Sequence, residues 1–258
     1  MSTLNAVVTH LGPATAKEDL ELLRAVTPGA RFVVCHGGSR EDFEGVETDD
    51  KVFMDDPSLR GPARHLQSWT QAFEAIWHRY FESDDSLDSL YLFEFDHLIL
   101  DRDYEQRLRD LAEATGAGLM GKNCVPREGT NWEHYVRWRR DERLLAHLRS
   151  ISVREQPTKL YGCLGDGMWL SRNALRSYVA VGEHPPCYNE TYVPTLLHHL
   201  GFRVVDVDSH SDLYSHVRFA PVFCFDEVMS LAKRGGTAFV HPVKDRAANA
   251  ALLRSAAS

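Results

Sequence analysis

Hydrophobic and polar positions in the first half of the chain alternate between two patterns. Short apolar runs at residues 4–11, 31–35 and 51–54 predict strands. Apolar residues recur at three- and four-residue spacing in 16–26 and 66–81, which predicts amphipathic helices. This alternation predicts an α/β domain with a mostly parallel central sheet and helices on both faces.

A longer apolar and aromatic run at residues 89–93 predicts a buried strand that ends in Glu94, Asp96 and His97. Because alternate side chains of an extended chain point the same way, Glu94 and Asp96 face one point in space. Two carboxylates at the end of a buried strand are costly unless a cation neutralises them. Since Mg²⁺ and Mn²⁺ prefer oxygen ligands, the pair predicts a divalent cation site. The alternative is a strand end that merely reaches solvent.

The rest of the chain continues with strands and helices. Asp101 is expected to cap a helix over 102–115, which Gly116 ends. Further strands are expected at 117–120, 168–170, 203–207 and 237–240, and further helices at 172–181, 191–200 and 226–233. Ligands of such sheets bind beyond the carboxyl ends of the strands. One crevice is therefore expected to hold the strand ends at Thr9, His10, His36, Gly37 and Glu94–His97.

Two acids of the second half, Asp166 and Glu190, are candidate functional residues because of their positions in the sequence. Asp166 lies between Gly165 and Gly167, where it either faces a polyhydroxyl ligand or serves as the turn aspartate of a hairpin. Glu190 follows Asn189, the expected N-cap of a helix. A carboxylate in a first helical turn is favoured by the helix dipole, so capping alone also explains Glu190.

Two further segments allow either a structural or a functional interpretation. Residues 121–157 are basic and aromatic, with Trp132 and Trp138 among them, and form either a solvated helix or the wall of an acceptor pocket. A second acidic and histidine-containing cluster is a rival metal site, and it consists of Asp206, Asp208, His210, Asp212 and His216.

Composition narrows the class of protein. The net charge of -8, from 29 basic and 37 acidic residues, argues against a general nucleic-acid binder. No apolar run approaches the roughly 20 residues of a membrane span, so no integral membrane segment is expected. The first residues lack the features of a signal peptide. The five cysteines are odd in number and lack CxxC spacing, which favours free thiols and a cytoplasmic protein.

Together these motifs resemble nucleotide-sugar-dependent glycosyltransferases of the GT-A fold. The resemblance implies that Glu94-Phe95-Asp96 is a variant of the Asp-x-Asp motif, with Glu94 in place of the first Asp, and holds Mn²⁺ or Mg²⁺ on the diphosphate of a UDP- or GDP-sugar. It also implies that His241 is a further metal ligand and that Lys244 lies near a phosphate. It implies one domain over 1–258, with a nucleotide-binding half (about 1–121) and an acceptor-binding half (about 122–245). The Ala- and Ser-rich tail, 246–258, is expected to be frayed.

The implied activity is transfer of a sugar to a hydroxyl of a small-molecule or glycan acceptor. Inverting transfer needs a base for the acceptor proton, for which Glu190 is the first candidate and Asp166 the second. One alternative is a haloacid-dehalogenase-like phosphatase with Asp96 as nucleophile, although Leu98 and Leu100 replace the Asp and Thr of that motif. Another is a non-catalytic domain that binds a nucleotide or sugar.

Overall fold

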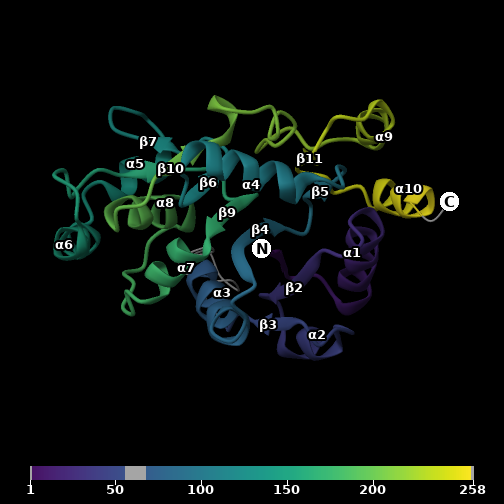
Figure 1. The fold of residues 1–258 in the computed structure, drawn as a ribbon, viewed down its shortest axis with the longest axis horizontal. Coiled ribbons are helices and arrows are strands. Elements are labelled where there is room, and N and C mark those ends of the chain that lie inside the picture. Colours follow the sequence, from purple (N-terminus) through teal and green to yellow (C-terminus); the bar gives the residue numbers. More distant parts are fainter. Residues whose placement is uncertain (1, 56–67, 257–258) are drawn as a thin grey trace.

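The structure is a computed structural model that describes residues 2–55 and 68–256. Its central feature is a seven-stranded sheet in the order β10-β6-β9-β4-β1-β2-β3 (Figure 1). The strands of this sheet are β1 (Ser2–Thr9), β2 (Arg31–His36), β3 (Lys51–Phe53), β4 (Leu87–Glu94), β6 (Leu119–Gly121), β9 (Met168–Ser171) and β10 (Val204–Asp206). Neighbouring strands are parallel except at β9, which runs antiparallel between β4 and β6. The predicted α/β fold with a mostly parallel sheet is therefore confirmed.

Two small sheets and a set of helices complete the described chain. The short strands are β5 (Leu98–Ile99), which pairs with β11 (Phe239–Val240), and β7 (Val125–Pro126), which pairs with β8 (Tyr161–Gly162). The helices are α1 (Pro13–Val26), α2 (Arg40–Gly45), α3 (Ser68–Ile76), α4 (Tyr104–Thr115), α5 (Glu133–Trp138), α6 (Glu142–Ile151), α7 (Arg172–Val179), α8 (Asn189–His199), α9 (Phe225–Arg234) and α10 (Arg246–Ala256). A π-helical segment, η2 (Trp77–Phe81), extends α3, and a 3₁₀ turn, η3 (Val207–Ser209), follows β10.

The main sheet buries both faces, because alternate residues of its strands point to opposite sides. Leu90 and Leu92 of β4 belong to the core shared with α3, α7 and α8, whereas Tyr91 and Phe93 belong to the core shared with α1 and α4. Both cores are covered by helices, so polar chemistry is left to the ends of the strands.

Most predicted elements form within a few residues of the expected bounds, and the predicted cap of the helix over 102–115 needs correction. Leu66 and Gln67, at the start of the helix predicted over 66–81, lie outside the described residues. Asp101 does not cap α4, since the helix begins after Asp103 and Asp101 instead accepts a bond from the Asp103 N–H and pairs with Arg107. Gly116 ends α4 as expected, with φ of 63° in the left-handed region.

The carboxyl-terminal tail is a correction to the sequence prediction. Residues 246–256 are not frayed but form α10, which packs against α1. Arg246 forms an ion pair with the buried Asp19 at 2.6 Å, and Asn249 donates to the same carboxylate at 3.2 Å. These bonds and the burial of Ala248 and Leu252 offset the cost of ordering the segment.

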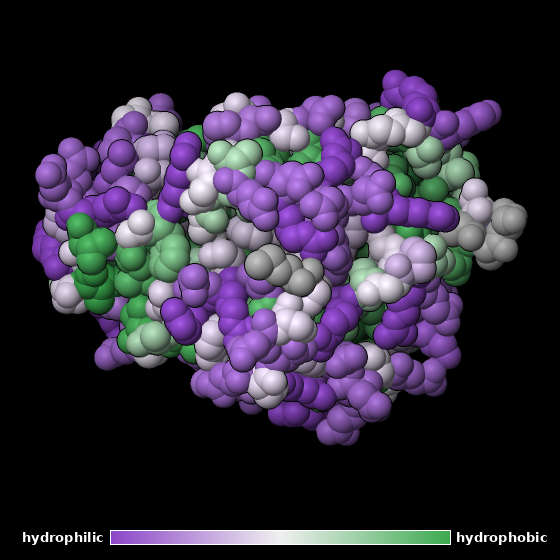
Figure 2. Space-filling view, viewed as in Figure 1, coloured by the Kyte–Doolittle hydropathy of each residue, from purple (hydrophilic) through white to green (hydrophobic). Residues whose placement is uncertain are grey.

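The surface is largely hydrophilic on the face seen in Figure 2, with hydrophobic residues visible toward the end that carries α6 and toward the opposite end, near α9 and α10. No helix in the described ranges is long and apolar enough to span a membrane.

Candidate functional site

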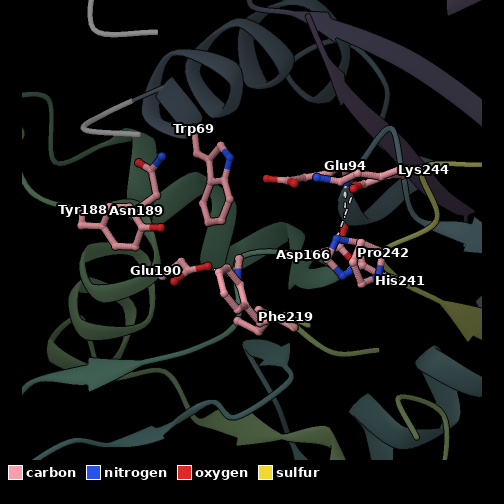
Figure 3. Close-up of a pocket in the computed structure, with 13 residues that line it drawn as sticks. Trp69, Glu94, Asp166, Tyr188, Asn189, Glu190, Phe219, His241, Pro242 and Lys244 are labelled. Carbon is pink, nitrogen blue, oxygen red and sulfur yellow. Dashed lines mark hydrogen bonds and ion pairs between the residues drawn. The ribbon is translucent and has the colours of Figure 1, made fainter. Parts of the chain in front are cut away.

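A cavity of about 200 Å³ opens beyond the carboxyl end of β4 (Figure 3). Side chains from distant parts of the chain line it, because the loops after β4, before β9, before α8 and after β11 all reach this edge of the sheet. Six residues that the sequence singled out share this cavity: Glu94, Asp96, Asp166, Glu190, His241 and Lys244.

Glu94, Asp96 and His241 form a cluster with the geometry of a cation site. One potential ligand atom from each lies within 4.8 Å of the others. The Asp96 side chain is buried, and its Oδ1 accepts no hydrogen bond, although His241 Nε2 lies 3.4 Å away. A buried carboxylate oxygen without a donor is costly, and a divalent cation would satisfy it. Two carboxylates and one imidazole therefore fit Mn²⁺ or Mg²⁺, with coordination positions left for phosphate oxygens or water.

The orientation of the His241 ring also suits it to bind a divalent cation. Its Nδ1 donates to the Arg218 carbonyl at 3.0 Å, which assigns the proton to Nδ1 and leaves Nε2 facing Asp96. The backbone is held as well, because the His241 N–H donates to His216 and the Arg218 N–H donates to His241. Outer bonds of this kind fix the ring of a metal-binding histidine.

The crowding of acids raises two pKa values in the cluster. Burial, followed by the charges of Asp166 and Asp96, raises the pKa of Glu94 to about 8. Burial alone would lower the pKa of His241, but the charges of Asp166, Asp96 and Glu94 outweigh it and raise the pKa to about 9. Both shifts indicate a site with excess negative charge that a cation would relieve.

Asp166 holds the cluster together from behind. Its Oδ1 accepts a 2.8 Å bond from the Glu94 N–H, and its Oδ2 pairs with His97 Nδ1 and lies 3.6 Å from His241 Nδ1. Burial opposes ionisation, but the charges of His97 and His241 outweigh it and lower the pKa of Asp166. The carboxylate is thus buried and engaged, which weakens its candidacy as a base. The hairpin alternative is wrong, since β8 and β9 belong to different sheets.

Glu190 occupies the opposite side of the cavity. Tyr188 rather than Asn189 is the N-cap residue of α8, and Glu190 lies in the first turn as expected. Its Oε1 accepts a 2.7 Å bond from the Gly165 N–H, and Figure 3 shows its carboxyl group pointing into the cavity. Burial raises the pKa of Glu190 to about 7, against the opposing effects of that N–H and of Arg127. A carboxyl group with this pKa can exchange a proton near neutral pH.

Gly165 makes this arrangement possible. A Cβ at this position would lie 2.7 Å from both Glu190 Oε1 and the Trp69 ring. Only glycine therefore lets the backbone N–H reach the Glu190 carboxylate while Trp69 packs beside it.

Four predicted residues lie outside the lining of this cavity. The Thr9 hydroxyl accepts from the Leu11 N–H at 3.2 Å, and the Gly37 N–H donates to the Thr9 carbonyl at 2.8 Å. The ring of His36 is fully buried and bonds to Leu11 and Gly38, so it shapes the loops and is not available to a ligand. His10 is exposed, with its ring edge-on to Phe95 at 5.1 Å.

The rival acidic cluster is not a metal site in the described ranges. Asp208 pairs with Lys122 at 2.6 Å, Asp212 pairs with Arg107 at 3.1 Å, and Asp206 accepts from Ser209. Lys122 and Arg107 therefore neutralise two of the three acids, and His210 and His216 do not join the acids in a group of ligand atoms.

Three residues important to the site were missed from the sequence. His97 stands beside the acids in the sequence, which does not reveal its pairing with Asp166, and the helical spacing of Trp69 indicates core packing, which its burial supports although it also lines the cavity. Phe219 was not considered, because an isolated aromatic residue in a loop carries no periodic signal. The bond between His241 and Arg218, which precedes Phe219 in the chain, is evident only in the structure.

No family model matches this sequence, and none of the curated proteins matches it. Solved structures with a similar overall path include a glycosyltransferase involved in the glycosylation of the major capsid of PBCV-1, at 10% identity, covering 100% of this chain and 99% of that chain with a TM-score of 0.43. Rv0371c from Mycobacterium tuberculosis H37Rv is 12% identical over 80% of this chain and 87% of that chain, with a TM-score of 0.43. The galactosyltransferase LgtC, in complex with donor and acceptor sugar analogs, is 13% identical over 99% of this chain and 96% of that chain, with a TM-score of 0.41. Two of these three structures are glycosyltransferases, the class of protein that the sequence motifs resemble.

Proposed function

We propose that this protein is a glycosyltransferase that moves a sugar from a nucleoside-diphosphate sugar to an acceptor hydroxyl. The observation that carries the proposal is the division of one cavity. A cation-binding cluster of Glu94, Asp96 and His241 lies on one side, and the Glu190 carboxyl group, with a pKa of about 7, lies on the other. Inverting sugar transfer needs a stabilised diphosphate and a base on opposite sides of the reacting carbon.

The donor diphosphate would bind at the cluster side. Glu94, Asp96 and His241 would hold Mn²⁺ or Mg²⁺ there, and the bound cation would supply positive charge to offset the charge developing on the leaving diphosphate. Lys244 is exposed at the same edge and adds a further positive charge toward the phosphates (Figure 3). The nucleoside of the UDP- or GDP-sugar would extend toward Thr9, His10 and Gly37 at the ends of β1 and β2.

Glu190 would act as the general base in a single displacement. The acceptor oxygen forms a bond to the anomeric carbon, the bond from that carbon to the diphosphate oxygen breaks, and the diphosphate leaves with the electron pair. The acceptor proton passes to the Glu190 carboxylate, and the anomeric configuration inverts. A rigid first turn of α8 and the bond from Gly165 hold the carboxylate in position.

The acceptor would enter from the side of α8 and α5. His134 of α5 stacks on Tyr188 with ring centroids 3.7 Å apart, and Tyr188 lines the cavity beside Glu190. The proposed function therefore implies a nucleotide-binding half, about 1–121, and an acceptor-binding half, about 122–245, within one domain, with His241 and Lys244 of the second half reaching the donor diphosphate.

A donor screen tests the proposal. Purified protein with Mn²⁺ is incubated with UDP-, GDP- and dTDP-sugars, and release of the nucleoside diphosphate is followed by chromatography. Metal-dependent release from one donor class is expected, and NMR of the product should show an inverted anomeric centre. Binding without release would favour a non-catalytic domain, and release of inorganic phosphate from simple phosphate esters would favour the phosphatase alternative.

A further inference from the structure

Phe219 projects its ring into solvent at the edge of the cavity. The side chain is 85% exposed, more than the other large exposed hydrophobic residues of the described ranges, Val136, Val153 and Val222. Single exposed apolar residues are ordinary and need no explanation. Phe219 differs because it is aromatic and lines the same cavity as Glu190 and His241.

The backbone on both sides of Phe219 is fixed. The Arg218 carbonyl accepts from His241 Nδ1, and the Arg218 N–H donates to the His241 carbonyl, each at 3.0 Å. On the other side, the Phe223 N–H donates to Pro242 at 2.9 Å, and the Arg218 guanidinium lies 3.6 Å from the centre of the Phe223 ring. The segment that carries His241 therefore holds the loop, so the exposed ring is presented at a defined place.

The surroundings of the ring define the kind of ligand that would cover it. Figure 3 shows Phe219 between Glu190 on one side and Asp166 and His241 on the other, with Trp69 across the cavity. A ligand here meets carboxylates at its edges and aromatic carbon at its face. A pyranose ring fits this environment, because its hydroxyl groups lie around its edge and its C–H groups form apolar faces.

We propose that Phe219 stacks on a sugar ring of the acceptor, so that the acceptor is a glycoside or glycan and not a small molecule without such a ring. This inference rests on the proposed function, since it places the acceptor beside Glu190. The ring lies at the exposed rim, where an acceptor enters, whereas the donor nucleoside is expected at the ends of β1 and β2. Removal of the ring should weaken acceptor binding and leave nucleotide binding unchanged.

Saturation-transfer difference NMR tests the inference with a panel of methyl α- and β-glycosides of glucose, galactose, mannose and N-acetylglucosamine. The samples contain Mg²⁺, which is diamagnetic and leaves the ligand signals sharp, and either UDP or GDP. At least one glycoside should bind the wild type, and Phe219→Ala should raise its dissociation constant about tenfold, the size of a lost aromatic contact. Phe219→Tyr should restore binding, because it keeps the ring face. Val222→Ala, in the same loop but outside the lining of the cavity, is the matched control and should bind like the wild type.

Three outcomes would overturn the inference: no glycoside of the panel binds the wild type, Phe219→Ala binds as tightly as the wild type, or Phe219→Ala loses Mn²⁺-dependent UDP and GDP binding. The last outcome would assign the ring to the nucleotide. Failure of the proposed function has a separate signature, since the wild type would then show no Mn²⁺-dependent binding of either diphosphate by calorimetry.

Discussion

Asp166 and Glu190 are acids of one cavity whose pKa values move in opposite directions. The charges of His97 and His241 lower the pKa of Asp166 despite its burial, whereas burial dominates at Glu190 and raises its pKa to about 7. Environments that separate two acids in this way also separate their roles. Asp166 is suited to a permanent charge that positions its neighbours, and Glu190 is suited to proton exchange.

Replacing Glu190 with Gln should lower turnover by about 10²–10⁴-fold, the usual contribution of a general base. The amide keeps the shape and the bond from Gly165 but cannot accept the proton, so donor binding should stay nearly unchanged. In the wild type, kcat/KM should fall as pH drops through about 7, because the raised pKa protonates Glu190 below that value. Initial rates between pH 5 and 9 measure both effects.

Glu183→Gln is the matched control for this change, since its side chain is 91% exposed and should leave the rate and its pH dependence unaltered. A Glu190→Gln variant with near-normal turnover would return Glu190 to a role in helix capping.

Cation binding should be tighter at high pH. A divalent cation needs ionised Glu94 and an unprotonated Nε2 on His241, yet their pKa values of about 8 and 9 leave both groups protonated at neutral pH. Mn²⁺ affinity should therefore rise between about pH 7 and 9, with release of protons. Calorimetry in buffers of different ionisation enthalpy measures the protons released. Affinity that does not change over this range would contradict the assignment.

Short loops, more than helices or strands, set the geometry of the site. The turn before β9 brings the Gly165 N–H to Glu190 and Asp166 to the end of β4, while the strand end at His241 anchors the loop of Phe219. Loops held by a rigid sheet commonly carry functional residues.

Gly165→Ala should impair the site without unfolding the protein. The new Cβ would meet Glu190 Oε1 and the Trp69 ring at 2.7 Å, so the carboxylate must move away from its donor. Turnover should fall at least about tenfold, because small displacements of catalytic groups are costly. Gly12→Ala, whose Cβ would lie 3.9 Å from Asp42, should leave the initial rate unchanged. A Gly165→Ala enzyme with the wild-type rate would show that this close approach is not required.

Helix α10 should contribute measurably to stability. Arg246→Ala leaves the buried Asp19 carboxylate without its ion pair, which should cost roughly 2 kcal/mol of unfolding free energy. Arg254→Ala, at an exposed position of the same helix, should cost little. Urea denaturation compares the two variants, and equal losses would show that the Asp19 pair is not what holds α10.

Elements were predictable where local pattern determines them. The apolar run before Glu94 and the three- and four-residue spacing of apolar helix residues are local patterns that do not depend on distant contacts. They therefore predict β4 and most helices where the structure has them. The helix in the tail was not predictable because its Ala and Ser residues form no strong apolar pattern. In the fold, α10 packs against α1, and Arg246 pairs with Asp19. The acid pair and His241 followed from motif resemblance, but Phe219 and the bonds of Asp166 depend on contacts between distant segments.

At the scale of the whole molecule, the cation cluster and Glu190 come from different parts of the chain. The parallel strands β1, β2 and β4 end at one edge of the sheet. Because β9 runs in the opposite direction, it begins at that edge, and the turn before it places Asp166 there. The segment after β11 returns from the far end of the chain with His241 and Lys244. The cluster of Glu94, Asp96 and His241 therefore exists only in the complete fold, and under the proposed function nucleotide binding would depend on folding of both halves.

Calorimetric titration of UDP and GDP, with and without Mn²⁺, into the wild type and Asp96→Asn tests the central proposal most directly. The wild type should bind one of the two diphosphates in a Mn²⁺-dependent manner, and Asp96→Asn should abolish this binding while circular dichroism shows an intact fold. Asp208→Asn, in the rival acidic cluster, should bind like the wild type. Unchanged Mn²⁺-dependent affinity in Asp96→Asn would contradict the assignment of the cation and diphosphate to the end of β4.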